Sequence, residues 1–232
     1  MKSPHKSLPF LNAGIILLAF MITAAACSKT KKEYYSDGSL KSEITYRNGR
    51  MNGPAIWFYT NGNKQMECTY NDDKLEGVIS RWYFNGNKQQ EDHFVDDQKT
   101  GQSFQWDETG KKTTEDNFVN DTLEGYHREW HPNGQLLVEG QFHKGLFEGM
   151  WTYWDERGLV VGRGEFHNGS GKQTGYYWNG KLKREIPYQN NKKHGKEVWY
   201  REDGTIIKEI LFEAGRVVEI VVGDTTNINS KY

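Results

Sequence analysis

The chain has 232 residues, a formal net charge of −1, 35% hydrophobic residues and 14% aromatic residues, with Gly 25, Trp 8 and Tyr 13. This composition excludes a helical bundle and favours many short strands joined by tight turns, with aromatic rings supplying the buried area. The balanced charge provides no attraction for nucleic acid, so no nucleic-acid partner is expected.

The N-terminal segment has the three parts of a secretory signal. Lys2 and Lys6 precede a stretch without charge, residues 7–28, which is apolar in its middle and has three alanines directly before Cys27. It resembles a bacterial lipoprotein signal, which implies that residues 1–26 form a signal peptide and that the Cys is the lipid attachment site. An uncleaved membrane anchor is the alternative, because about 20 apolar residues can span a bilayer.

The same resemblance implies a location and a partner. A lipidated Cys27 attaches the chain to a membrane of the bacterial cell envelope, and Ser28 directly after it favours the outer membrane. Residues 27–33 are then expected to form a short polar tether between the lipid and the folded domain.

From residue 34 onward, three sequence registers repeat together. Turn glycines recur at steps of 24, with a single step of 22, at Gly38, Gly62, Gly86, Gly110, Gly134, Gly158, Gly180 and Gly204. Rings follow by eight residues at Tyr46, Tyr70, Phe94, Phe118, Phe142, Phe166, Tyr188 and Phe212. Rings also precede by four residues at Tyr34, Phe58, Trp82, Trp106, Trp130, Trp154, Tyr176 and Tyr200. The two-residue deletion shifts all three registers at one place, which indicates copies of a single structural unit.

Each copy predicts a β-hairpin. Pairs such as Asn61-Gly62 supply the positive φ angles of tight turns, and a second turn site three residues after each ring is always Gly, Asn or Asp. Between the turns the chain alternates, with Leu40, Ile44 and Tyr46 on one face. Short connections at both ends require neighbouring strands to pair antiparallel.

We therefore predict an all-β fold, an elongated single-sheet antiparallel meander built from about eight 24-residue β-hairpin repeats. A single hairpin is marginally stable in water, so the repeats must stack to bury their rings. The repeat domain is expected over residues 34–222, with a last strand at 217–222 and a disordered tail at 223–232.

Three stretches resemble a known family. Tyr46–Gly53, Phe142–Gly149 and Tyr188–Gly195 each run from a ring through turn residues to a glycine, as MORN repeats do, and they most resemble the bacterial variant of that repeat. The resemblance implies a MORN-like strip of hairpins that contacts proteins or membrane surfaces and carries no catalytic residues. Some bacterial relatives are described as antitoxins. Asp-Asp replaces Asn-Gly at residues 72–73 and 96–97, which weakens the turn prediction there.

No motif for catalysis is present: the sequence lacks a Walker loop, HExxH, CxxC and a serine-hydrolase elbow. We expect no enzyme activity, no cofactor and no metal. His127, Glu129 and His131 alternate along one strand, and His143 and His167 recur in later repeats, so a metal site is a minor alternative.

A row of glutamates has a simpler interpretation than metal binding. Copies two strands apart lie roughly 10 Å from one another, too far for one ion to be shared, so a solvated row of salt bridges is expected. Its members are Glu43, Glu67, Glu91, Glu115, Glu139, Glu185 and Glu209, with Arg163 as the exception. Cys68, without a disulfide partner, is expected to be a small buried hydrophobic residue.

Aromatic residues divide into two groups. A ring present in every copy is typical of packing, so a structural aromatic row is expected at Phe58, Trp82, Trp106, Trp130, Trp154, Tyr176 and Tyr200, with Trp130 largely buried. Rings that vary between copies are candidates for partner contact: Trp57, Tyr59, Tyr83, Trp151, Trp178 and Trp199.

The leading function hypothesis is a non-catalytic envelope lipoprotein whose strip mediates protein–protein or membrane-surface interaction, with another envelope protein as the partner. The first alternative is a module that binds carbohydrate or peptidoglycan by stacking sugars on exposed rings. The second alternative is an immunity or antitoxin-like protein that blocks one toxin.

Overall fold

The protein is described by a computed structural model over residues 28–222, a range that contains strands and turns and no helix. The first ten strands are β1 (Ser28–Tyr34), β2 (Leu40–Arg47), β3 (Arg50–Phe58), β4 (Lys64–Asn71), β5 (Lys74–Trp82), β6 (Lys88–Val95), β7 (Gln98–Lys99), β8 (Gly101–Trp106), β9 (Lys112–Val119) and β10 (Thr122–Leu123). The other ten are β11 (Gly125–Trp130), β12 (Leu136–His143), β13 (Leu146–Trp154), β14 (Val160–His167), β15 (Ser170–Tyr176), β16 (Leu182–Gln189), β17 (Lys192–Lys193), β18 (Gly195–Tyr200), β19 (Ile206–Glu213) and β20 (Arg216–Val222). The predicted signal peptide, Cys27 and the tail at 223–232 lie outside the described residues.

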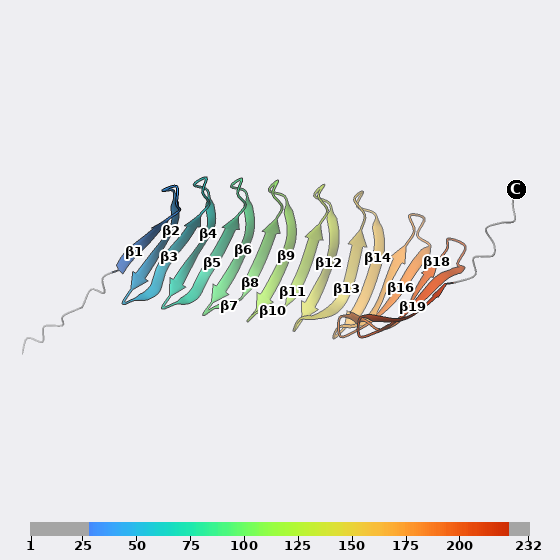
Figure 1. Ribbon diagram of the computed structural model, residues 1–232. Coiled ribbons are helices and arrows are strands. Elements are labelled where there is room, and N and C mark those ends of the chain that lie inside the picture. Colours follow the sequence, from blue (N-terminus) through green and yellow to red (C-terminus); the bar gives the residue numbers. More distant parts are fainter. Residues whose placement is uncertain (1–27, 223–232) are drawn as a thin grey trace, which may run out of the picture.

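The strands form one antiparallel meander in which each pairs with the next along the chain. Strands β7 and β8 are two halves of one strand, both paired with β6, and β10–β11 and β17–β18 are interrupted in the same way. Figure 1 shows the resulting elongated strip, with strands lying across its long axis. The predicted fold class and the predicted last strand are confirmed.

The N-terminal edge of the strip differs from the prediction. Residues 28–33, expected as a free tether, belong to β1, which pairs with β2 from Ser28 opposite Arg47 to Glu33 opposite Ser42. All seven side chains of β1 are exposed. An edge strand without a buried face needs no apolar alternation, and that alternation was the signal by which the other strands were predicted.

The two turn sites of each repeat have different geometries. At the first, Gly62 N–H donates to Tyr59 O at 2.9 Å and Tyr59 N–H donates to Asn63 O at 2.8 Å, which closes a three-residue loop with Gly62 at φ +84°. At the second, two residues with positive φ form the turn, for example Asp72 at 48° and Asp73 at 70°. This is the conformation that matches the twist of paired strands in hairpins.

The Asp-Asp turns are not weak points. Asp73 Oδ1 accepts the Met51 N–H at 2.7 Å, and Asp73 N–H donates to Met51 O at 2.8 Å. Asp97 makes the same two hydrogen bonds with the backbone of Leu75 in the preceding repeat. The turns at residues 72–73 and 96–97 are therefore present despite the loss of Asn-Gly, and each carboxylate adds a bond between repeats that glycine cannot make.

Burial is concentrated in one row of side chains along a single face, which we call the central row. It contains the most buried residues of the sheet, among them Ala55 at 0%, Cys68 at 1% and Ile186 at 1% exposure, so the prediction for Cys68 is confirmed. Burial also raises the pKa of the Cys68 thiol. Strand pairing orders the row as Ile44, Ala55, Cys68, Ile79, Asp92, Ser103, Asp116, His127, Gly140, Trp151, Gly164, Gln173, Ile186, Glu197 and Ile210.

The opposite face carries the glutamate row and the structural aromatic row together. Lys64 bonds Glu67 at 2.6 Å and lies 5.5 Å from the centre of the Trp82 ring in the next repeat. Lys112 repeats the arrangement with Glu115 at 3.0 Å and the Trp130 ring at 5.3 Å. The salt-bridged glutamate row is therefore confirmed.

Trp130 is mostly covered, in line with the prediction, but it is not fully buried. The other members of the structural aromatic row, from Phe58 to Tyr200, are buried to a similar intermediate degree. These rings lie on the face covered by lysine side chains, while the core occupies the central row. A ring in every copy thus indicates packing between neighbouring repeats. Because the sheet is a single layer, nothing covers this face completely, and the rings stay partly open to water.

Candidate functional site

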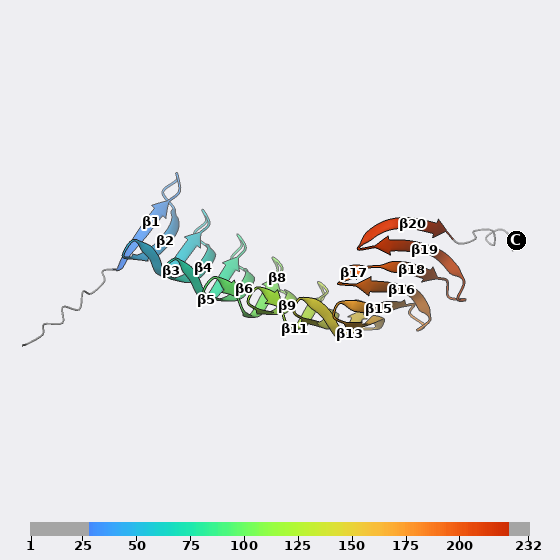
Figure 2. The same cartoon turned by 90° about the horizontal axis from the view of Figure 1, so that it is seen from below.

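The strip bends where the sequence deletes two residues. Figure 2 shows that the strands from β1 to β13 follow one another with a steady twist, whereas β15 to β20 turn away and stack in a new direction. A Cβ on Gly171 in β15 would lie 2.0 Å from Glu165 O, and one on Gly162 would lie 2.9 Å from Thr174 O. Backbones therefore approach at β14 and β15 more closely than side chains would allow.

A large ring fills the inner side of this bend. Trp151 is 4% exposed and contacts Val138 and Phe166, with Phe147, Phe142 and Tyr188 around them. Its flanking positions in the central row are glycines: Gly164 is its strand partner, and a Cβ on Gly140 would lie 2.0 Å from the Trp151 ring. The ring occupies space that three side chains share elsewhere in the row.

Asn191 ties the second turns of three repeats together at the bend. Its Oδ1 accepts the Phe147 N–H at 2.8 Å, its Nδ2 donates to Gly145 O at 2.8 Å, and its own N–H donates to Gly169 O at 2.9 Å. A Cβ on Gly169 would lie 2.7 Å from Asn191 Oδ1, so the side chain passes through space that this glycine leaves open.

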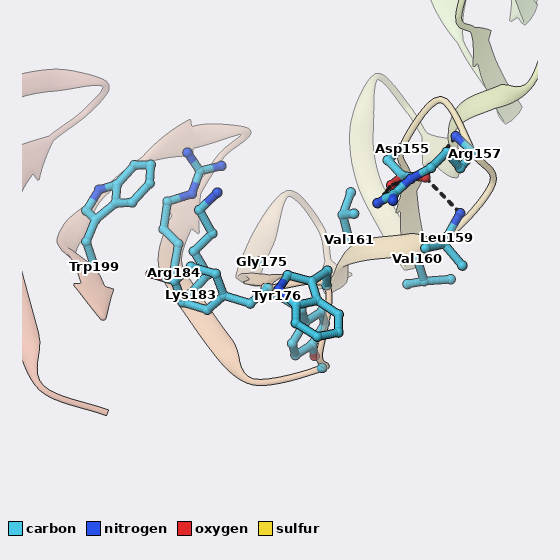
Figure 3. A pocket seen from close by; sticks show the side chains of 13 residues that line it. Asp155, Arg157, Leu159, Val160, Val161, Gly175, Tyr176, Lys183, Arg184 and Trp199 are labelled. Atoms are coloured by element: carbon cyan, nitrogen blue, oxygen red, sulfur yellow. Dashed lines mark hydrogen bonds and ion pairs between the residues drawn. The ribbon is translucent and has the colours of Figure 1, made fainter. Parts of the chain in front are cut away.

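A groove of about 630 Å³ lies at the bend. Figure 3 shows side chains reaching it from the turn before β14, from β14 and β15, and from β16 and β18. Its lining comprises Asp155, Arg157, Leu159, Val160, Val161, Gly175, Tyr176, Tyr177, Trp178, Gly180, Lys183, Arg184 and Trp199. Four rings and three aliphatic side chains make it apolar, with charge at its margins.

The charges of the groove do not cancel. Arg157 pairs with Asp155 through Nη2 at 2.8 Å and Nε at 3.1 Å, and this bond together with backbone N–H donors lowers the pKa of the Asp155 carboxyl. Lys183 has no carboxylate partner among the lining residues. Arg184 Nη1 lies 4.0 Å from Glu197 Oε1 behind the groove wall, and Lys193 pairs with the same carboxylate at 2.6 Å, so one acid is shared by two cations. The groove therefore carries an excess of positive charge beside apolar surface, which suits an acidic segment with apolar side chains.

Two of the predicted contact residues, Trp178 and Trp199, line this groove. Trp178 is 79% exposed, the highest exposure among the large hydrophobic residues described. Trp199 is half-buried and forms a fixed wall: its Nε1 donates to Glu197 at 2.7 Å, and Arg184 and Lys208 lie 4.7 and 4.8 Å from its ring. Trp178 thus offers a free ring, and Trp199 a rigid, cation-flanked one.

The other four predicted contact residues lie elsewhere, and three of them have roles within the fold. Trp151 is buried at the bend, so its assignment as a contact residue is wrong. Tyr59 and Tyr83 each use the hydroxyl to bond the backbone of the next repeat, at Trp82 O (2.8 Å) and Trp106 O (2.9 Å). Trp57 packs beside Ala55 and, with Tyr59, lines a smaller groove of about 290 Å³.

The functional residues that sequence reasoning missed are Leu159, Val160, Lys183 and Arg184, which line the groove. One signal could have found them, because they flank the two-residue deletion between Gly158 and Gly180. A break in a regular repeat changes the direction of the strip, and a change of direction creates a concave surface.

The histidines do not converge. His127 Nδ1 lies 2.7 Å from Asp116, His143 bonds Glu124, His167 bonds Glu148, and His131 bonds Trp154 O. In the described part of the chain no group of three or more His, Cys, Asp or Glu side chains is arranged to hold a metal ion. The strands and turns of residues 28–222 likewise include no helix that could span a membrane.

The His127 side chain is largely buried, unlike those of His143 and His167. Burial alone would lower its pKa, but hydrogen bonds to Asp116 and to Glu129 outweigh that effect and raise the pKa to about 9. The central row therefore holds a charged pair between its apolar part and the bend.

These features define the class of the protein: a single-layer β-meander of stacked hairpins with a bend and an open groove, an architecture suited to binding. The family described as MORN repeat variant matches residues 29–48, 51–72, 75–96, 123–144, 170–190 and 193–214, more than half of the chain. The chain belongs to this family, whose repeats generally serve as non-catalytic modules for interaction with proteins or membranes. The segment from 145 to 169, which enters the bend, lies between two matches. A comparison with curated proteins found no match.

Proposed function

We propose that this chain is a non-catalytic interaction module, held at the bacterial cell envelope by a lipid on Cys27, which binds an acidic, apolar segment of another envelope protein in the groove at the bend. The observation that carries the proposal is the lining of that groove, which combines the exposed Trp178 with three cations, Arg157, Lys183 and Arg184, and one carboxylate, Asp155. The carboxylates of the partner pair with the cations, and its apolar side chains pack on the rings.

The energetics favour recognition of this kind. Exposed ion pairs contribute little in water, but an aromatic anchor near the centre of an interface commonly dominates binding. Trp199 is already immobilised by Glu197, Arg184 and Lys208, so little side-chain entropy is lost when a partner covers it. Trp178 must be ordered on binding, which offsets part of its contribution.

The anchor rests on the sequence of the first 28 residues. The charge-free stretch, the three alanines and Cys27 support export and lipidation, and two or more acyl chains provide stable attachment. Because β1 begins at Ser28, a lipid on Cys27 places the N-terminal edge of the strip against the headgroups, without a tether between them.

The test of the groove uses charge reversal. Full-length chain is expressed with Cys27 intact, and envelope proteins are captured after solubilisation with the wild type and with the double variant Lys183→Glu/Arg184→Glu. The matched control is Arg47→Glu/Arg50→Glu, which reverses two exposed charges at the other end of the strip. We expect one dominant partner to be lost with the groove variant and kept with the control. Equal capture by all three chains would refute the groove as the binding site.

The test of the anchor is separate. Cys27→Ser should abolish labelling by a fatty-acid analogue, leave the precursor unprocessed and retain Met1 in mass spectra. A wild-type protein that retains Met1 and carries no lipid would overturn the lipoprotein proposal while leaving the groove untouched.

One observation favours a second candidate, a carbohydrate ligand. Trp178 exposes 79% of its surface in the groove that Trp199 also lines, and flat exposed rings stack on sugars. Titration with neutral N-acetylglucosamine oligomers separates the two candidates. A sugar ligand predicts binding that is lost with Trp178→Ala and unaffected by Lys183→Glu/Arg184→Glu, whereas an acidic protein segment requires both the ring and the cations.

A further inference from the structure

We propose that a second copy of this chain pairs with strand β20, so that the sheet continues across a twofold axis. Strand β20, Arg216–Val222, pairs with β19 on one side, and within residues 28–222 no strand pairs with its other side. An edge strand of this kind presents unpaired N–H and C=O groups that act as a template for another strand. The inference is independent of the groove and of the anchor.

The side chains of β20 favour pairing with an apolar strand. Five of its seven residues are Val or Ile, and all seven are exposed. Their exposures are Val217 54%, Val218 54%, Ile220 59%, Val221 47% and Val222 65%. Proteins usually protect such edges with lysine, proline or a very short strand, and β20 has none of these devices.

The opposite edge of the strip is protected in the usual way. Strand β1 carries Lys29, Lys31 and Lys32 among its seven exposed residues, and Lys31 pairs with Glu33 at 2.9 Å. Head-to-tail pairing would set this polar strand against the valines of β20 and would add copies without limit. Pairing of β20 with itself matches apolar with apolar residues and closes after two copies.

One antiparallel register also keeps the like charges apart. Directly opposite residues share a face of the sheet, and a twofold axis perpendicular to the sheet leaves each residue on its own face, so the residue at the axis lies opposite itself. Val218 is skipped in the pairing with β19 and forms a bulge, so the regular part of the edge is residues 219–222. With Ile220 at the axis, Ile220 lies opposite Ile220 of the second copy and Glu219 lies opposite Val221, so the two Glu219 carboxylates do not face each other.

The first experiment measures mass in solution. The full-length chain, purified in detergent, should show a concentration-dependent dimer by sedimentation velocity. Ile220→Lys places a charge on the apolar edge and should leave only monomer at the same concentrations. Val160→Lys is the control, because Val160 is 38% exposed but lies in the groove, and it should dimerise as the wild type does. A wild-type monomer at every concentration, or a dimer unaffected by Ile220→Lys, would overturn the proposal.

The second experiment tests the register and guards against variants that fail to fold. Ile220→Cys places two thiols opposite each other across the axis, so mild oxidation should join the two copies by a disulfide. Val221→Cys is the control, because Val221 lies opposite Glu219 and its own copy is a diagonal neighbour beyond the reach of a disulfide; it should cross-link at least about tenfold more slowly. Equal cross-linking of the two variants, or none with Ile220→Cys, contradicts the pairing.

Lys183→Glu/Arg184→Glu separates this inference from the proposed function. It should abolish capture of the groove partner and leave the dimer unchanged, whereas Ile220→Lys should do the reverse. Loss of the dimer in the groove variant would show that β20 is not the contact between copies.

Discussion

The arm of the strip, β2 to β9, and its bend, β12 to β16, use the same register of the repeat in opposite ways. In the arm the central row is filled by residues of modest size, with Ala55, Cys68 and Ile79 forming one buried cluster. At the bend, Trp151 occupies the position that Ile79 holds three repeats earlier, and glycines stand on either side of it. Equal filling keeps the arm regular, while one large ring between two glycines allows the strands to close toward each other.

The difference has a functional meaning. The groove beside Trp57 in the arm has a volume of about 290 Å³, whereas the groove at the bend has about 630 Å³. Both are built from the same hairpin, so recognition in this protein depends on a local departure from the repeat and not on the repeat itself.

The largest expected effect tests the packing of the bend. Trp151→Ala should destabilise the protein by about 3–5 kcal/mol, because it empties a buried ring site that the neighbouring glycines cannot refill. Ile79→Ala, at the same register in the arm, should cost about 2–4 kcal/mol. Urea unfolding followed by circular dichroism measures both. Trp178→Ala, at an exposed ring, is the control and should stay within about 0.5 kcal/mol.

Gly140→Ala tests whether the missing side chain at Gly140 makes room for the Trp151 ring. A methyl group there would lie 2.0 Å from the Trp151 ring, so the loss should be comparable to that of an overpacked core, about 1–3 kcal/mol. A Gly140→Ala protein as stable as the wild type would show that the glycines do not make room for the ring.

The next effect concerns the charged pair between the arm and the bend. The folded-state pKa of His127, about 9, lies above its ordinary value of 6.5, so its contribution is complete below about pH 6.5 and is lost as pH rises through 9. The free energy of unfolding should fall across that window by at most about 3 kcal/mol. His127→Gln should flatten the profile, whereas His167→Gln, at an exposed residue, should leave it unchanged.

A smaller effect is expected on the opposite face. Trp130→Ala should cost about 1–2 kcal/mol, less than a fully buried ring, because Trp130 is only partly buried beneath Lys112. Glu139→Ala, on the same face, should remain within about 0.5 kcal/mol, since its bond to Arg128 is solvent-exposed. A loss from Trp130→Ala as large as that from Trp151→Ala would place the core on both faces.

The smallest effect compares the same hydrogen bond in both regions. Tyr83 in the arm bonds Trp106 O at 2.9 Å, and Tyr177 near the groove bonds Tyr200 O at 2.6 Å. Each Tyr→Phe change should cost about 0.5–1.5 kcal/mol, as the loss of one neutral hydrogen bond does. If only Tyr177→Phe weakens partner capture, the bond positions the groove as well as stabilising it.

Local sequence predicted most of the fold and little of the site. The turns and strand directions follow from glycine, asparagine and ring spacing within single repeats, and the structure confirms them. The role of a ring does not follow in that way: neither Trp151 nor Trp178 stands at a position that is aromatic in every copy, but Trp151 is buried because of Gly140 and Gly164 in neighbouring strands, whereas Trp178 is exposed. Strand β1 was missed for a related reason, since its only partner is β2 and its own residues are polar.

Asn191 gives the bend a mechanical property that the arm lacks. The hydrogen bonds of the sheet lie along the axis of the strip, so a pull on its two ends opens the arm one strand pair at a time. At the bend, Asn191 is hydrogen-bonded to Gly169, Phe147 and Gly145, which belong to two earlier repeats. A force on the turn of Asn191 is therefore shared by three hydrogen bonds, which must break together. Under tension the arm would lengthen before the groove changes shape, so the bound partner would be held while the strip extends.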